Sequence, residues 1–294
     1  MGLAFGIRPA GPHAIKHAVK DFSKLRPMDK QRVSDGTHAS TAYLQKRAAS
    51  NAFWTRQALR YGSDIEATAS TAFICRATLK RLKSLVKPNS HILEVGCGNA
   101  TSLLAPLSRL CYAYGVDLTL EMLLAAKNRH KHIRGLVRAD ACYLPFPDKH
   151  FDVVYTSRCL INILDPEMQR LGILELFRVA KSDGVVALVE NFQEPVRRMN
   201  VAIDRYRAGS PVRDDHNLWL NLQDTVDYCR ELGWRPVRIR GNTMGSFLSQ
   251  ILLRNALPER LLYPLCAILT DLEDRFGEKL PLFGKDTFVV FQNQ

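Results

Sequence analysis

The chain has 294 residues, enough for one large domain or for a core domain with appendages. Hydrophobic residues make up 46% of it and charged residues 24%, which excludes a mainly disordered protein. The net charge of +12 is unevenly distributed: residues 1–88 contain 16 Lys and Arg against 5 Asp and Glu, whereas residues 89–294 contain 25 against 24. This division argues against a basic nucleic-acid groove that spans the whole fold.

The seven cysteines favour a reducing compartment. They are dispersed, form no Cys-x-x-Cys pair and have no His partners at metal-ligand spacing. The longest strongly apolar run, residues 261–270, has half the length of a membrane span and contains Pro264. We therefore expect a cytoplasmic protein without a transmembrane segment and without a bound metal.

Residues 1–40 are predicted to form a basic N-terminal extension. Its large apolar residues follow one helical stripe, namely Ile15, Val19, Phe22 and Leu25. The first 20 residues contain no acid, so an organelle presequence is an alternative to a flexible or accessory helix. From residue 41 to residue 88 the apolar spacing predicts helices, which end at Pro88.

After residue 88, short apolar runs alternate with helical stretches. Strands are predicted at 91–95, 113–116, 133–137, 151–156, 185–189, 237–239 and 287–291. Helices are predicted at 101–109, 119–130, 167–180 and 223–232, with a mostly helical insertion at 242–285. The alternation predicts an α/β fold in residues 89–294: a Rossmann-like, mostly parallel seven-stranded sheet with helices on both faces, an N-terminal helical extension, and the insertion before the last strand.

The clearest chemical signal is the sequence HILEVGCGNA at residues 91–100. An apolar strand leads into two glycines and then into a helix. Gly96 permits a tight turn, Gly98 allows a ligand to approach the backbone, and the helix start offers free N–H groups. A dinucleotide fingerprint would require Gly or Ala where this chain has Thr101, so the signal is not that of a dinucleotide site.

Two carboxylates follow the next two predicted strands. Asp117 comes 19 residues after Gly98, where a carboxylate can accept hydrogen bonds from both hydroxyls of a ribose. The alternative is that Asp117 caps a helix starting at Leu118. Asp140 follows the third strand and could accept a hydrogen bond from the amino group of adenine, or it could belong to a simple turn.

Taken together, these segments resemble the class I S-adenosylmethionine-dependent methyltransferases, particularly the methyltransferase type 11 domain group. The resemblance covers residues 91–190 and includes Phe151–Ile163 and Leu176–Glu190. It implies that the chain binds S-adenosylmethionine and transfers its methyl group, and that the helices at 41–88 cover the cofactor. The residues that it implies in cofactor binding are Glu94, Gly96, Cys97, Gly98, Asp117, Leu118, Met122, Asp140, Ala141 and Ser157.

The chain departs from the family pattern at two places. The usual third glycine is Ala100, and the common Leu-Glu-His run after the fourth strand is Leu160-Ile161-Asn162, which lacks the histidine near the substrate. Catalytic candidates are therefore taken from the residues themselves. Arg158 could hold a carboxylate or phosphate of the acceptor, or pair with a neighbouring acid. His216, next to two aspartates, could be an oriented base or a solvated loop residue.

The expected function is methyl transfer to a small-molecule acceptor such as a sugar, a glycan precursor or a secondary metabolite; the glycan class rests on analogy. The acceptor could be anionic, or lipid-linked if the apolar residues of 242–285 form a lid rather than a core. One alternative is an RNA methyltransferase anchored by the basic N-terminal region, although no RNA-binding module is recognisable. The other is a non-catalytic scaffold that retains the fold.

Overall fold

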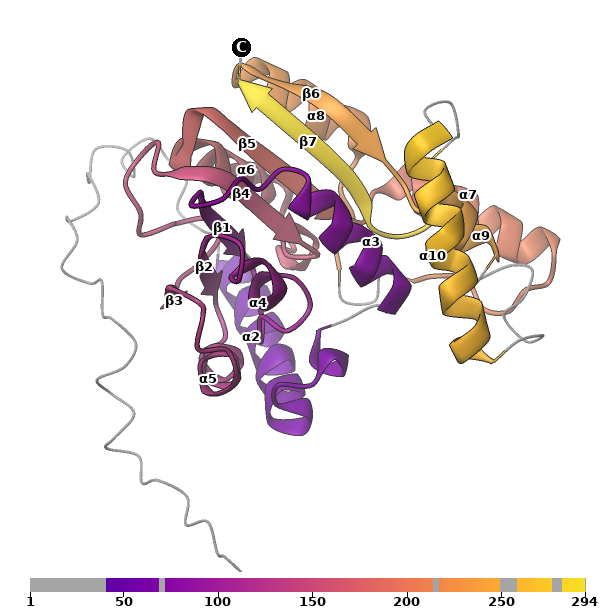
Figure 1. The fold of residues 1–294 in the computed structure, drawn as a ribbon, viewed down its shortest axis with the longest axis horizontal. Coiled ribbons are helices and arrows are strands. Elements are labelled where there is room, and N and C mark those ends of the chain that lie inside the picture. The colour runs from indigo at the N-terminus through magenta and orange to yellow at the C-terminus, as the bar shows by residue number, and fades with distance from the viewer. Residues whose placement is uncertain (1–40, 69–71, 214–216, 249–257, 277–281, 294) are drawn as a thin grey trace, which may run out of the picture.

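The computed structural model describes residues 41–68, 72–213, 217–248, 258–276 and 282–293 (Figure 1). Within them, seven strands form a single sheet in the order β3-β2-β1-β4-β5-β7-β6. β7 is antiparallel to both of its neighbours, and the other pairs are parallel. The strands are β1 His91–Val95, β2 Tyr112–Asp117, β3 Gly135–Arg138, β4 Phe151–Ser157, β5 Ala180–Glu190, β6 Trp234–Arg240 and β7 Thr287–Asn293. All seven predicted strands and the predicted fold class are confirmed.

Helices cover both faces of the sheet, because side chains alternate between the faces along each strand. On β1, Leu93 and Val95 pack in the core cluster that includes residues of α6 (Pro166–Val179) and α8 (Leu222–Glu231). Ile92 packs in the opposite cluster with α3 (Ala72–Lys83), α4 (Leu104–Leu107) and α5 (Leu120–Arg129). The buried strand ends therefore hold the turns that follow them in fixed positions.

The N-terminal helices lie beside the carboxyl ends of the first strands. α2 (Thr41–Tyr61) packs on α5, and the 3-10 helix η2 (Ile65–Ala67) follows it. Trp54 and Tyr61 pack with Ala67 against the buried side chain of Met122. One face of α2 therefore lies on the sheet domain, and α2 and α3 confirm that the apolar spacing of residues 41–88 indicates helices.

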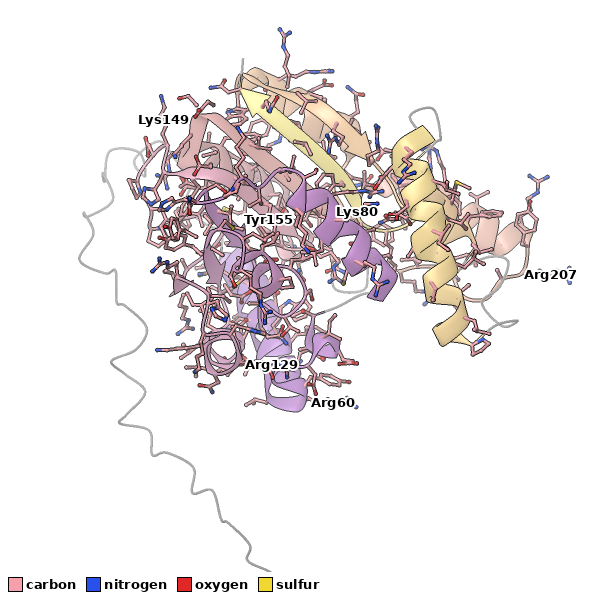
Figure 2. The ribbon with its side chains drawn as sticks, in the orientation of Figure 1. Arg60, Lys80, Arg129, Lys149, Tyr155 and Arg207 are labelled. Carbon is pink, nitrogen blue, oxygen red and sulfur yellow. The ribbon has the colours of Figure 1, made fainter. Side chains whose placement is uncertain are left out.

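The segment between β6 and β7 contains α9 (Thr243–Phe247) and α10 (Glu259–Phe276), which confirms a helical insertion. Arg81 of α3 anchors it: the buried guanidinium donates to both carboxylate oxygens of Asp274 and to the carbonyl of Gly241. Lys80 of α3 lies beside α10 (Figure 2), where it pairs with Asp271. The packing expected of the insertion is only partly present, since one face of α10 is exposed to solvent: Leu261, Leu265, Ile268 and Leu272. No helix in the described part of the chain is long and apolar enough to span a membrane.

Two helices differ from the sequence prediction. The helix expected at 101–109 has only the four residues of α4, since Ala100 is left-handed and Pro106 lacks an N–H group. The structure adds α7 (Gln193–Arg205), in a stretch for which no helix is predicted. The helical signal was present in the buried spacing of Val196, Met199 and Ile203. The short 3-10 helix η3 (Leu160–Asn162) follows β4.

Candidate cofactor and acceptor site

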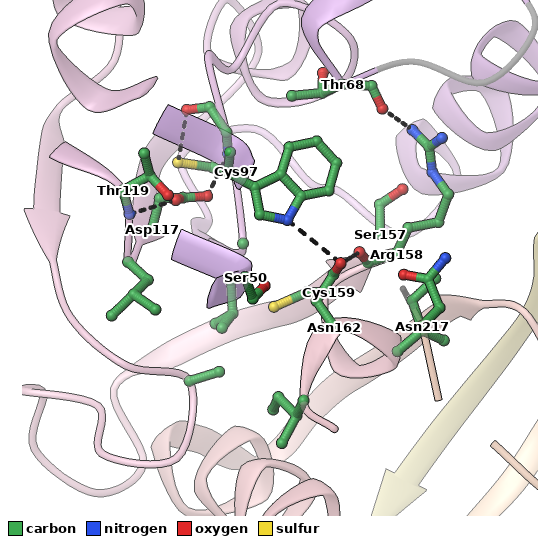
Figure 3. Close-up of a pocket in the computed structure, with 18 of the residues that line it drawn as sticks. Ser50, Thr68, Cys97, Asp117, Thr119, Ser157, Arg158, Cys159, Asn162 and Asn217 are labelled. Atoms are coloured by element: carbon green, nitrogen blue, oxygen red, sulfur yellow. Dashed lines mark hydrogen bonds between the residues drawn. The ribbon is translucent and has the colours of Figure 1, made fainter. Parts of the chain in front are cut away.

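A cavity of about 370 Å³ lies at the carboxyl ends of β1, β2 and β4, under α2. Its size is within the range of ligand pockets. The strand order reverses between β1 and β4, which is where open α/β sheets bind ligands. Figure 3 shows Asp117 and Thr119 on one side of the cavity and Arg158, Asn162 and Asn217 on the other. We call these the Asp117 side and the Asn162 side.

The two glycines of the turn after β1 are required by the protein's own packing. Both have positive φ, +76° at Gly96 and +52° at Gly98. A β-carbon on Gly96 would lie 2.5 Å from the Cβ and Sγ atoms of Cys159, and one on Gly98 would lie 2.6 Å from Cγ2 of Thr68. The sequence predicts a ligand close to Gly98; in this structure the side chain of Thr68 lies near Gly98 and that of Cys159 lies near Gly96.

Asp117 points into the crevice beside the glycine turn. Its Oδ2 accepts a hydrogen bond from the N–H of Gly98 at 2.8 Å, and its Oδ1 accepts one from the N–H of Thr119 at 2.8 Å. Helix α5 begins at Leu120 with Thr119 as its N-cap residue, so the alternative of Asp117 as the helix cap is wrong. Burial raises the pKa of Asp117, while the backbone hydrogen bonds oppose the rise.

Glu94 lies at the base of the cavity and is 4% exposed. Its Oε2 accepts a hydrogen bond from the Tyr155 hydroxyl at 3.0 Å. Burial raises the pKa of this carboxyl to about 8, and nearby Asp117 contributes to the rise. A cation that enters the cavity would favour the ionised form of this carboxyl and lower its pKa.

Asp140 is held by helix α2. Its Oδ2 lies 2.6 Å from Nε of Arg47, and its Oδ1 accepts a hydrogen bond from the N–H of Cys142 at 3.0 Å. Arg47 could not be identified from the sequence, because the ion pair joins positions 93 residues apart. Leu118, Ala141 and Met122 also line the cavity, as does Cys97.

The loop after β4 is anchored by a buried carboxylate at the end of β5. Glu190 accepts hydrogen bonds from the N–H groups of Cys159, Leu160 and Ile161. Burial raises the pKa of Glu190 to about 7, and the hydrogen bonds it accepts oppose the rise. This contact keeps Ser157 and the residues after it at the cavity wall.

Arg158 joins three segments around the cavity. Its φ is +53°, its Nη2 donates to the carbonyl oxygen of Thr68, and its Nε lies 3.7 Å from Oδ1 of Asp286. The sequence left open whether Arg158 holds the acceptor or pairs with an acid. The structure shows the pairing with Asp286, together with the contact to Thr68.

Amide and cationic side chains line the Asn162 side. Nε1 of Trp54 donates to Oδ1 of Asn162 at 3.3 Å, and Nδ2 of Asn162 donates to the carbonyl oxygen of Arg158. The other lining residues here are Asn191, Val212, Arg213, Asn217, Trp219 and Lys285. His216 lies outside the described residues; its described neighbours Arg213 and Asn217 both line the cavity. Within the described residues no group of three His, Cys, Asp or Glu side chains could hold a metal ion.

Comparison with known proteins agrees with this arrangement. A family model described as a methyltransferase domain matches residues 93–188. The demethylmenaquinone methyltransferase of Anoxybacillus flavithermus is 32% identical over 192 residues, covering 57% of this chain and 78% of that protein. The chain belongs to the class I S-adenosylmethionine-dependent methyltransferases.

Other relatives match a shorter part of this methyltransferase, and a solved structure matches its fold. The ubiquinone/menaquinone biosynthesis C-methyltransferase UbiE of Vibrio parahaemolyticus is 34% identical over 156 residues, 48% of this chain and 58% of that protein. The chain spans about half the length of several of the curated relatives that it matches. A TehB-like methyltransferase structure from Corynebacterium glutamicum has a TM-score of 0.52 at 14% identity, covering 83% of this chain and 99% of that chain, and shares the fold.

The residues of this methyltransferase fit its cofactor, S-adenosylmethionine. The cofactor carries a sulfonium, an ammonium group, a ribose diol and an adenine amino group. Three carboxyl groups line the cavity: Glu94, Asp117 and Asp140. Carboxylates attract the two cations and accept hydrogen bonds from the hydroxyls and the amino group. The carboxyl oxygens of the site therefore fit the hydrogen-bond donors of the ligand.

Ala100 is a strained position next to the site. Its φ is +61° and its side chain is 2% exposed. A left-handed conformation costs an L-residue such as alanine about 1–2 kcal/mol, which glycine does not pay. Against this, glycine loses more conformational freedom on folding, which costs roughly 0.5–1 kcal/mol. We expect Ala100→Gly to raise the free energy of unfolding by up to about 1 kcal/mol in urea denaturation. Ala126→Gly, within helix α5, is the control and should lower it. A loss of stability in Ala100→Gly would contradict the strain at this residue.

Proposed function

We propose that this methyltransferase transfers the methyl group of S-adenosylmethionine to a hydroxyl of a polar small molecule, of the sugar or glycan-precursor class. The observation that carries the proposal is the composition of the Asn162 side: Asn162, Asn191 and Asn217 with Arg158 and Lys285. Amide groups both donate and accept hydrogen bonds, as hydroxyls require, and the cations suit an acceptor with a carboxylate or phosphate.

The bound cofactor would supply an electrophilic methyl group on a sulfonium. The task of the protein is then to align the acceptor and to exclude water. Glu94, Asp117 and Asp140 would hold the cofactor. Trp54 covers the cavity from α2, and its hydrogen bond fixes the orientation of the Asn162 amide. The fixed amide oxygen and nitrogen would orient an acceptor beside the Asp117 side.

A hydroxyl acceptor also needs a base, because a neutral hydroxyl is a weak nucleophile and must lose its proton as it attacks the methyl group. We propose His216 for this role, on the grounds that its chain neighbours Arg213 and Asn217 line the cavity. Arg158 is proposed to act indirectly on the acceptor. Its guanidinium contacts Thr68 and Asp286 and so holds the segments that carry these residues in position around the acceptor. His216→Asn should then slow methyl transfer without changing the affinity for the cofactor.

The names of the relatives favour a second candidate, methyl transfer to a quinone-type ring. Demethylmenaquinone methyltransferases recur among them. The apolar side chains of Ile161, Val212 and Trp219 at the Asn162 side could contact such a ring. The two candidates differ in the atom methylated: oxygen for a sugar, ring carbon for a quinone.

The test is the transfer of a radiolabelled methyl group from S-adenosylmethionine to defined acceptors. Sugars, sugar phosphates, a demethylquinol analogue and total RNA are offered separately to the full chain. Labelled sugar would support the proposal, and labelled quinol or labelled RNA alone would replace it. Calorimetry with S-adenosylmethionine is run beside it, and absence of binding would favour a scaffold instead.

A further inference from the structure

A second hollow adjoins the cavity on its outer side. It lies along helix α7 and shares the side chain of Trp219 with the cavity. We call it the α7 groove; its lining residues are Gln193, Arg197, Asn200, Val201, Asp204, Leu218 and Trp219. Trp219 therefore stands between the Asn162 side of the cavity and an open surface.

The backbone around Trp219 is held in place without any ligand. Nε2 of Gln193 donates to the carbonyl oxygen of Trp219 at 3.0 Å. Leu218 is fixed on both sides: its N–H donates to the carbonyl oxygen of Ile161 at 2.7 Å, and its carbonyl oxygen accepts from Nε2 of Gln169 at 2.7 Å. The same Gln169 amide also donates to the carbonyl oxygen of Leu160, in the loop after β4. The backbone at Trp219 is thus fixed relative to the loop after β4, and an aromatic side chain on a fixed backbone loses little conformational freedom when it binds a ligand.

The lining of the groove combines apolar and charged side chains. Val201, Leu218 and Trp219 are the apolar members, and Val201 is 63% exposed. Arg197 and Asp204 are exposed, and within the described part of the chain neither takes part in an ion pair.

The remaining amide of the groove is already engaged. Both polar atoms of Asn200 bond to the backbone of Val212 and hold that residue at the cavity wall. The groove is thereby tied to the cavity at Val212 as well as at Trp219.

We propose that the α7 groove is a second sugar subsite, so that the acceptor is an oligosaccharide of at least two units. The reacting unit lies in the cavity, and the next unit lies against Trp219. A pyranose presents an apolar C–H face and a rim of hydroxyls, which match a lining that combines an aromatic side chain with a guanidinium and a carboxylate. An isoprenoid tail would instead leave Arg197 and Asp204 desolvated without partners. This inference rests on the proposed function and deepens it.

The test measures the binding of matched sugars to the full chain in the presence of S-adenosylhomocysteine. Saturation-transfer NMR and titration compare glucose with maltose, galactose with lactose, and N-acetylglucosamine with its β-1,4 dimer. In the unmodified chain, at least one disaccharide is expected to bind ten times more tightly than its monosaccharide. Trp219→Ala should remove that advantage, Trp219→Phe should restore most of it, and Arg197→Ala should reduce it at least threefold.

Arg198→Ala is the matched control, because Arg198 is the neighbouring exposed arginine and its Nη1 donates to the carbonyl oxygen of Leu282, away from the groove lining. It should bind the disaccharide like the unmodified chain. If no disaccharide in the set binds, or if Trp219→Ala and Arg197→Ala bind it unchanged, the subsite is overturned. Calorimetry with S-adenosylmethionine separates the two proposals. If the unmodified chain does not bind the cofactor, the proposed function is overturned. If it binds the cofactor but binds no disaccharide more tightly than the monosaccharide, only the second sugar subsite is overturned.

Discussion

Asp117→Ala is expected to weaken the binding of S-adenosylmethionine by about 100-fold while the chain stays folded. The carboxylate of Asp117 points into the cavity and would accept hydrogen bonds from both ribose hydroxyls. A hydrogen bond to a charged group contributes about 1.5–3 kcal/mol, and about 1.4 kcal/mol is a tenfold change in affinity. The substitution also leaves the N–H groups of Gly98 and Thr119 without this acceptor, so a loss of stability of about 1–3 kcal/mol should accompany it.

Titration calorimetry measures the affinity, and circular dichroism checks the fold. Asp117→Asn keeps one acceptor oxygen and should bind the cofactor with an affinity between those of the alanine variant and the unmodified chain. Asp227→Ala is the control, because Asp227 is an exposed carboxylate that pairs with Arg230 on α8, outside the cavity lining. A folded Asp117→Ala variant that binds the cofactor as tightly as the unmodified chain would show that the ribose assignment is wrong.

Much of the framework of this site is predictable from the sequence, because its signals are local. Strand β1 is recognisable as five apolar-rich residues before two glycines, and Asp117 as a carboxylate directly after the next strand. Parallel strands bring their carboxyl ends to one edge of the sheet, so residues 19 positions apart meet there. The hydrogen bond from the N–H of Gly98 to Asp117 shows that these two strand ends meet.

The contacts that shape the cavity from outside are not predictable in the same way. Arg47 meets Asp140, and Thr68 meets both Gly98 and Arg158, across long separations in the chain. Such pairings depend on how α2 and η2 pack, for which the local pattern provides only an amphipathic helix. The role of Gly98 illustrates the difference: the sequence indicates that a side chain is excluded there, whereas the structure identifies Thr68 as what excludes it.

The Asn162 side was the least predictable part of the site. Its residues come from the loop after β4, from the end of β5, from the chain after α7 and from the segment before β7. Helix α7 was missed because Pro195 and four arginines between 197 and 207 obscure its three buried apolar residues. Without that helix, Trp219 and Arg197 could not be assigned to one groove, so neither the α7 groove nor its connection to the cavity through Trp219 could be inferred.

Glu94→Gln is expected to remove a pH dependence of cofactor binding that the unmodified chain possesses. The pKa of Glu94 is raised to about 8 by burial, so at pH 7 the free protein holds this carboxyl mainly protonated. A cationic ligand beside it favours the carboxylate and lowers its pKa, so that binding releases a proton. The affinity for S-adenosylmethionine should therefore rise with pH, approaching about tenfold per pH unit below pH 8.

The free protein should show the opposite dependence. Because the pKa in the fold exceeds the ordinary value of 4.5, the contribution of Glu94 to the free energy of unfolding is complete below pH 4.5 and is lost as the pH rises through about 8. Glutamine is uncharged at every pH and can still accept a hydrogen bond from Tyr155. We therefore expect Glu94→Gln to unfold at an equal or higher temperature than the unmodified chain at pH 8, while it binds the cofactor about tenfold more weakly there.

Calorimetry at pH 6.5, 7.5 and 8.5, in two buffers of different ionisation enthalpy, measures both the affinity and the protons released. Glu190→Gln is the matched control: Glu190 is also a buried carboxyl with a pKa raised by burial, to about 7, but it faces the backbone of the loop after β4 and does not line the cavity. It should keep the pH slope of cofactor affinity that Glu94→Gln loses. Equal slopes in the unmodified chain and in Glu94→Gln would mean that the cation of the cofactor does not reach Glu94.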